Sequence, residues 1–157
     1  MRKNKNIYQI DQSGKVEQTH RPTVVAYSNG KRKAITLPSK EKKSLQNLYR
    51  DINKTRLFSI QVFSILVFLL IRDDIKNIGT LIVDREYPGH EPLIKRYLIR
   101  LILSEFKRQP SMQISFQTIG KSSSAHEVAH KAFKKKTKSK KIKLGEVLKF
   151  VVILTQK

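Results

Sequence analysis

The sequence predicts an α/β domain in which helices flank a mixed five-stranded sheet. Three stretches rich in β-forming residues stand near the N-terminus, and helical and strand-like patterns then alternate along the chain. Neighbouring strands followed by alternating helices and strands are typical of such a sheet. The expected order of elements is β-β-β-α-α-β-α-β-α. With 157 residues, the chain has the length of one domain with a single hydrophobic core.

The first three elements are predicted to be strands. Residues 7–12 end at a turn signal, Ser13-Gly14, and "TVVAYS" at 23–28 is rich in β-forming residues. Asn29-Gly30 then precedes "KAITL" at 33–37. Because Asn-Gly between two such stretches is a strong hairpin signal, we expect the second and third strands to pair.

Two helices are expected next. Residues 40–52 place Leu45, Leu48 and Tyr49 at helical spacing, which indicates one apolar face. Residues 56–71 are apolar on most sides, which is typical of a helix buried in the core. The apolar run within it covers 15 residues, fewer than the roughly 20 that a membrane span needs. We therefore expect no membrane partner.

The second half of the chain continues the alternation. In chain order, we expect a strand over 79–84, a helix over 92–107, a strand over 112–120 and a helix from the serines at 122–124 through Phe133. The residues after 144 fit a helix by their spacing and a strand by their β-branched end, and the helix is favoured.

This pattern predicts a simple organisation along the chain. Residues 1–6 are a frayed basic N-terminus, residues 7–133 form the domain, residues 134–143 are a lysine-rich segment, and residues 144–157 pack on the same domain. The absence of cysteine excludes disulfides and thiolate metal sites. The basic N-terminus lacks the apolar stretch of a signal peptide. We expect an intracellular protein, cytoplasmic or nucleoid-associated, and not a secreted one.

The charge balance indicates a polyanionic partner. The chain has 33 Lys and Arg against 12 Asp and Glu, a net charge of +21. Nucleic acid is the first candidate for this partner and an anionic membrane surface is the second, and nucleic acid is the one we expect. Eight lysines lie between Lys131 and Lys143, and clusters of this kind contact phosphates without sequence preference. The lysines expected to contact phosphates are Lys121, Lys134, Lys135, Lys136, Lys138, Lys140 and Lys141.

Three acidic residues are candidates for chemistry. Asp11 and Asp84 stand in or at the end of apolar stretches predicted to be strands. A carboxylate there loses solvation unless it is paired or holds a cation. Glu86 would share a side with Asp84 if the strand continued, and it is a candidate ligand or general base. The plainer alternatives are a turn role for Asp11 and pairing of Asp84 with Arg85 or a turn amide.

The chain resembles the ribonuclease H-like superfamily over roughly residues 7–133. The resemblance rests on the element order and on three segments, "IDQSG", "LIVDRE" and "SSSAHEVAHKAF". It implies that neighbouring central strands present Asp11 and Asp84 to Mg²⁺ or Mn²⁺, and that the protein hydrolyses phosphodiesters by two-metal catalysis. It also implies a fourth ligand on the last helix, where His126 is the nearest match. The superfamily's third acid lies on the first helix, where this chain offers Glu41.

A competing motif is present in the last helix of this region. Residues 126–130 read HExxH, the helical zinc signature in which His126 and His130 bind Zn²⁺ and Glu127 activates water. Only Glu146 follows as a candidate third ligand. Three functions therefore remain open: a Mg²⁺- or Mn²⁺-dependent nuclease, a non-catalytic nucleic-acid-binding protein on the same fold, and a zinc peptidase. RNA, DNA, a hybrid and a branched junction all remain candidate substrates.

Overall fold

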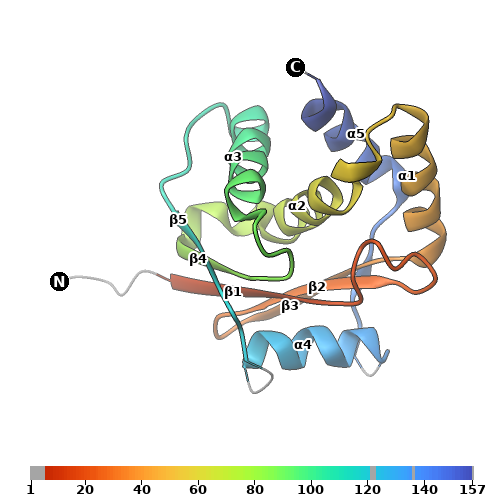
Figure 1. The fold of residues 1–157 in the computed structure, drawn as a ribbon. Helices are drawn as coiled ribbons and strands as arrows, with labels where there is room; N and C mark the ends of the chain where they lie inside the picture. The colour runs from red at the N-terminus through yellow and green to blue at the C-terminus, as the bar shows by residue number, and fades with distance from the viewer. Residues whose placement is uncertain (1–5, 121–122, 136, 157) are drawn as a thin grey trace.

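A mixed six-stranded sheet flanked by helices forms the body of the protein (Figure 1). The computed structural model describes residues 6–120, 123–135 and 137–156. The strands are β1 (Asn6–Ser13), β2 (Thr23–Ser28), β3 (Arg32–Leu37), β4 (Ile78–Asp84), β5 (Gln113–Gln117) and β6 (Lys140–Lys141). The helices are α1 (Ser39–Asp51), α2 (Phe58–Ile71), α3 (Glu91–Phe106), α4 (Ser124–Phe133) and α5 (Leu144–Thr155). The predicted α/β class with a mixed sheet is confirmed.

The expected number of five strands is wrong. The sixth strand, β6, has two residues inside the lysine-rich segment and pairs in parallel with β3. The amide of Ile142 also donates to the carbonyl of Thr36 at 2.8 Å, and the Ile142 side chain is buried. A run of lysines carries no strand signal, so pairing with an open sheet edge decides its backbone conformation.

The predictions for the two ends of the chain compare differently with the structure. The frayed N-terminus expected over 1–6 lies, apart from Asn6, outside the described residues, and Asn6 begins β1. The residues after 144 form helix α5, as the apolar spacing favoured. Its Glu146 side chain accepts from the Lys143 amide at 3.3 Å, which satisfies a backbone donor at the helix start.

Strand β1 is central in the sheet order β5-β4-β1-β2-β3-β6. It pairs antiparallel with β2 and parallel with β4, and β2 and β3 form the hairpin predicted at Asn29-Gly30. The parallel register aligns Ile10 of β1 with Val83 of β4. The strand that carries Asp11 therefore lies beside the strand that ends at Asp84, as expected.

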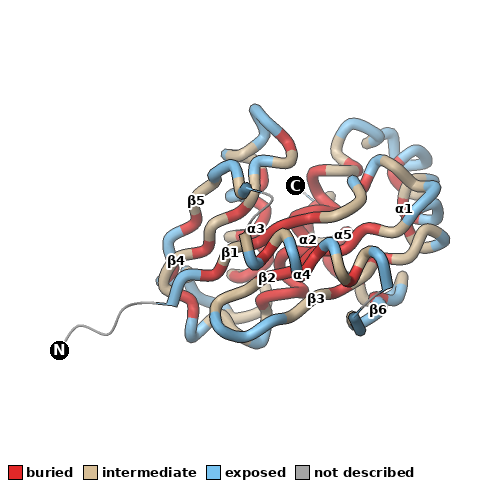
Figure 2. Tube along the Cα trace, turned by 90° about the horizontal axis from the view of Figure 1, so that it is seen from below, coloured by how far each residue is buried: buried red, intermediate tan, exposed pale blue. Residues whose placement is uncertain are grey.

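The two faces of the sheet differ in chemistry. Helices α1, α2, α3 and α5 cover one face, and α4 alone crosses the other (Figure 1). The four-helix side holds the main core, in which Ile10, Val83 and most of α2 are buried. On the α4 side, Ala26 and Ala34 pack with Ala129 of α4. These small side chains let α4 lie close to the strands. Figure 2 shows the buried residues concentrated in the central strands and the exposed ones toward the sheet edges.

Helix α2 lies inside the helical layer. The segment Thr55–Asn77, which includes short 3₁₀ turns on both sides of α2, is 23 residues long. It is apolar enough to cross a membrane by length and composition alone, yet 72% of its most apolar window is buried in the protein. Burial of this degree is what a core helix requires. The absence of a membrane partner stays a prediction.

Candidate metal centre

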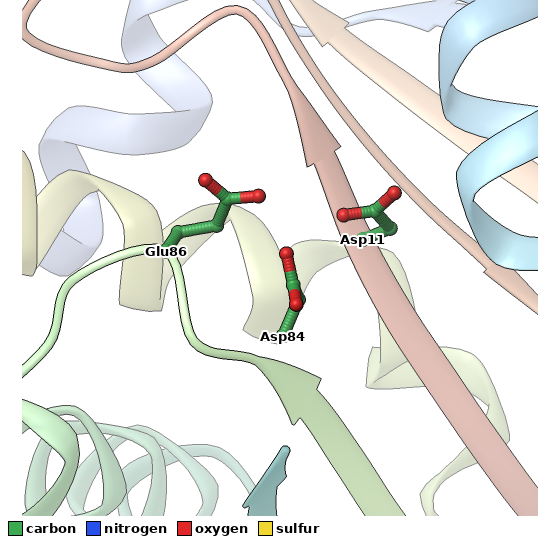
Figure 3. Close-up of side chains that lie close together, drawn as sticks. All are labelled: Asp11, Asp84 and Glu86. Atoms are coloured by element: carbon green, nitrogen blue, oxygen red, sulfur yellow. The ribbon is translucent and has the colours of Figure 1, made fainter. Parts of the chain in front are cut away.

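Three carboxylates converge where β1 and β4 approach their ends (Figure 3). Asp11 lies on β1, Asp84 is the last residue of β4, and Glu86 follows in the next loop. One oxygen atom from each carboxylate lies within 4.8 Å of the other two. Asp11 is buried, and Asp84 and Glu86 are partly buried. The three oxygens are thus close enough to bind one metal ion together.

Strand register explains why the two aspartates meet. The residues before them, Ile10 and Val83, are aligned partners on parallel strands, and both point into the main core. Because successive side chains on a strand alternate between the faces, Asp11 and Asp84 both point to the face that carries α4. Parallel strands end at the same edge of a sheet, so the two carboxylates lie side by side.

Glu86 reaches the centre by a turn instead of by strand alternation. Strand β4 ends at Asp84, and the Glu86 amide then donates to the Asp84 carbonyl at 2.9 Å. The intervening Arg85 amide donates to Gln117 of β5 at 3.1 Å. A bond between residues two apart closes a tight turn, and this turn brings the Glu86 side chain back toward the aspartates. The expected proximity is present, but its cause differs.

Hydrogen bonds hold both aspartates in place. Asp11 Oδ1 accepts from the Gln12 amide at 2.8 Å, and its Oδ2 lies 2.8 Å from Nδ1 of His126. Asp84 Oδ1 accepts from the Ile119 amide at 2.7 Å. His126 stands in the first turn of α4, where its own amide donates to the hydroxyl of Ser123. Donors that fix carboxylates in this way preorganise a ligand set.

Burial and neighbouring carboxylates raise the pKa values of Asp11 and Glu86. Burial, and then the charge of Asp84, raise the pKa of Asp11 to about 6. Burial, and then the neighbouring carboxylates of Asp84 and Asp11, raise the pKa of Glu86 to about 8, although Lys15 acts in the opposite direction. Both shifts show that negative charge is costly here without a cation. A bound cation would remove this cost and lower both pKa values.

The donor set fits a hard divalent cation. Three carboxylate oxygens are the ligands that Mg²⁺ and Mn²⁺ prefer, whereas zinc sites favour nitrogen and sulfur. Over the described ranges, no histidine joins the group whose ligand atoms lie together. The geometry thus supports metal binding by Asp11, Asp84 and Glu86, with His126 beside it.

The HExxH residues do not form a zinc site with a third protein ligand in the part of the chain that the structure describes. The rings of His126 and His130 are stacked, with centroids 5.9 Å apart, and His126 Nδ1 contacts Asp11. Glu127 faces solvent and pairs with Lys131 at 2.6 Å. A general base for peptide hydrolysis would have to face the metal instead.

The other predicted site residues lie outside the carboxylate group or outside the described residues. Glu41, on α1, is not part of the carboxylate group. The lysines Lys134, Lys135, Lys138, Lys140 and Lys141 are all exposed along the end of α4 and β6. Lys121 and Lys136 lie outside the described residues.

A buried lysine on α1 was not predicted. Lys42 is fully buried, and its ammonium donates to the carbonyls of Lys15, Gln18 and Arg21 at 2.7–2.9 Å. Three acceptors match the three donors of an ammonium. These hydrogen bonds fix the loop after β1, whose Lys15 charge acts on Glu86. Helical spacing could have indicated this burial, because Lys42 precedes Leu45 by three residues and so lies on the apolar face of α1.

The fold and the site together define a class: an α/β protein with a partly buried acidic cluster that can hold a metal ion. The sequence matches no protein-family model and none of the curated proteins with which it was compared. Function must therefore be argued from the site itself.

Proposed function

We propose that this protein is a ribonuclease H-like nuclease that hydrolyses phosphodiesters of nucleic acid with Mg²⁺ or Mn²⁺. The observation that carries the proposal is the convergence of Asp11, Asp84 and Glu86 within 4.8 Å in a chain of net charge +21. Acidic residues are scarce in this protein, yet three of them meet. A basic protein attracts a polyanion, and a hard cation held by carboxylates is suited to phosphodiester chemistry.

The topology supports the ribonuclease H-like assignment. The central strand β1 has an antiparallel hairpin on one side and the parallel strands β4 and β5 on the other. The acids stand on β1 and at the end of the neighbouring parallel strand, which agrees with the arrangement that the sequence resemblance implies. Ligand sites in open α/β sheets also form at the carboxyl ends of strands.

Each residue has a distinct role in this proposal. Asp11 and Asp84 bind the cation, and Glu86 is a further ligand or the base that accepts a proton from water. His126 holds Asp11 in position and takes part in proton transfer. The bound cation would activate the attacking water and stabilise the leaving oxygen. The exposed lysines of α4 and β6 bind phosphates and orient the strand to be cut.

The test is cleavage of labelled RNA, DNA, hybrid and junction substrates with Mg²⁺, with Mn²⁺ and with EDTA. We expect cleavage of at least one substrate, its loss in EDTA, and a fall on the order of a hundredfold or more in Asp84→Asn. Asparagine retains the oxygen that accepts from Ile119 but removes the charge. Asp51→Asn, at an exposed position on α1, is the matched control and should keep full activity.

The alternative is a non-catalytic nucleic-acid-binding protein on the same fold. Tight binding of nucleic acid with no cleavage under either metal would favour it. Zinc-dependent peptide cleavage that disappears in Glu127→Gln would contradict both nucleic-acid functions. The outward direction of Glu127 and its pairing with Lys131 argue against that outcome.

A further inference from the structure

A second concave site lies at the C-terminal end of α4, away from the acidic cluster. It is a groove of about 360 Å³ between α4, the edge of the hairpin and the lysine-rich segment. Its described lining contains no acidic residue. The lining residues that matter for binding are Phe133, Lys135, Lys138, Lys141, Thr36 and Ser139. An aromatic ring therefore stands in a groove whose charged groups are all cationic.

Phe133 is held in place by the backbone of the loop after β1. Gly14 has φ +76°, and a Cβ added there would lie 2.7 Å from Cε1 of the Phe133 ring. Only glycine lets the loop approach the ring so closely. The Arg21 guanidinium carbon and the Lys134 ammonium lie 5.8 Å and 6.0 Å from the ring centroid. The Phe133 ring is thus held against Gly14, and two cations lie over it.

One lysine of the groove, Lys141, is positioned by the sheet. Lys141 pairs with Thr36 in the β3–β6 ladder, and the hydroxyls of Thr36 and Ser139 are hydrogen bonded. Residues 139–141 thus follow the sheet edge, so the backbone that carries Lys141 has a set position before any ligand binds. Preorganisation of this kind lowers the entropy that binding costs.

The groove and the acidic cluster share one face of the sheet. Phe133 follows His126 by seven residues on the same helix, a rise of about 10 Å. Gly14, against which the ring packs, follows Asp11 by three residues. Stacked nucleotides of one strand advance by about 3.4 Å each, so a rise of about 10 Å corresponds to about three of them. A single strand could therefore span the two sites within a few nucleotides.

We infer that this groove binds one unstacked nucleotide of a single-stranded part of the substrate, with its base on Phe133 and its flanking phosphates on Lys135, Lys138 and Lys141. The inference rests on the proposed function for the identity of the strand. A volume of 360 Å³ is at the low end for ligand sites, so it suits one nucleotide and not a duplex. Every base has a π-face, so stacking on Phe133 would be sequence-tolerant.

Binding measured in EDTA tests this inference without catalysis. Fluorescence anisotropy would compare a labelled single strand with a blunt duplex of equal length. We expect Phe133→Leu to weaken single-strand binding about tenfold and to leave duplex binding unchanged. Because the change removes no charge, the salt dependence should not change. Phe133→Trp should restore affinity, and Phe106→Leu, at another half-buried position late in a helix, should have no effect. Equal weakening on single strand and duplex would overturn the inference.

A crosslinking experiment covers the case in which Phe133→Leu does not fold. A single strand that carries 5-iodouracil would be irradiated with the unmodified protein in EDTA, and the modified peptide identified. We expect the crosslink at Phe133, and a crosslink confined to other segments would contradict the groove.

Failure of cleavage with crosslinking intact would remove the nuclease proposal and keep the groove. Binding of adenosine monophosphate as tightly as the oligonucleotide would show a free-nucleotide site and overturn the inference.

Discussion

His126 Nδ1 lies 2.8 Å from Oδ2 of Asp11 and thereby links helix α4 to the central strand β1. The Asp11 side chain is almost fully buried, whereas about a third of the His126 side chain is exposed. With Asp11 ionised, the imidazole donates its Nδ1 hydrogen and holds the carboxylate in position. The helix that carries the groove at Phe133 therefore also orients one carboxylate of the acidic cluster.

Removal of this hydrogen bond should weaken metal binding. Residues that orient metal ligands typically change affinity by about 10–100-fold when removed. We expect His126→Ala to weaken Mn²⁺ binding by that factor, measured by calorimetry on the purified protein. His130→Ala removes a solvent-exposed histidine one turn later and should leave the affinity unchanged. Equal effects of the two substitutions would show that the Asp11 hydrogen bond is unimportant.

The stability of the metal-free protein should fall as pH rises. The pKa of Asp11 is raised to about 6 and that of Glu86 to about 8, whereas unfolded carboxyls titrate near about 4. The folded protein thus holds more protons than the unfolded chain between these values, so both groups stabilise it below about pH 4. That stability is lost as pH rises through about 6 and then about 8.

Urea unfolding in EDTA between about pH 5 and about pH 7.5 would measure this decrease in stability. A saturating concentration of Mg²⁺ should reduce or reverse it, because the cation favours the ionised carboxylates. Asp84→Asn should also flatten the profile, since its charge raises both pKa values. A profile that neither Mg²⁺ nor Asp84→Asn changes would mean that the three carboxylates do not interact as described.

The buried ammonium of Lys42 should be important for stability. Its three carbonyl acceptors in the loop after β1 would lose their donors in Lys42→Met. Loss of the partly buried hydrogen bonds of a charged donor costs about 1–3 kcal/mol, so the free energy of unfolding should fall by roughly that amount. Lys43→Met, at the exposed neighbouring position, is the control and should have little effect in the same denaturant titration.

The lysine-rich segment should set the salt dependence of binding. We expect the combined change of Lys134, Lys135, Lys136, Lys138, Lys140 and Lys141 to Gln to weaken binding to all sequences alike. Each phosphate that is no longer neutralised by a lysine should reduce the slope of log K against log salt by about 0.9 for duplex DNA. The control replaces six exposed cations elsewhere, namely Lys40, Lys43, Arg50, Arg56, Lys95 and Arg96. Equal slopes for the two variants would exclude a specific role for the segment.

The HExxH motif has a direct test. Glu127 is solvent-exposed and paired with Lys131, so Glu127→Gln should leave nuclease activity and folding unchanged. A zinc peptidase would instead lose its general base. Parallel assays on peptide and nucleic acid substrates with this one variant would separate the two functions.

Local patterns were enough to predict most of the elements and to name all three carboxylates as candidates. The Asn29-Gly30 hairpin, the all-apolar helix α2 and the buried strand before Asp84 follow from turn chemistry and hydrophobic periodicity, which depend on near neighbours in sequence. The same patterns indicated that Asp11 and Asp84 stand on strands, and the expected pairing of those strands then placed the aspartates together.

Interactions between distant segments decided the features that local patterns did not predict. Glu86 joins the cluster because the turn that follows β4 redirects it, and β6 exists because a sheet edge was open to a lysine-rich segment. The His126–Asp11 bond spans 115 residues of sequence, and the carbonyls bound by Lys42 lie in a different element from the lysine. No local pattern encodes such partners, because burial and hydrogen bonding are set by which segments the fold brings together.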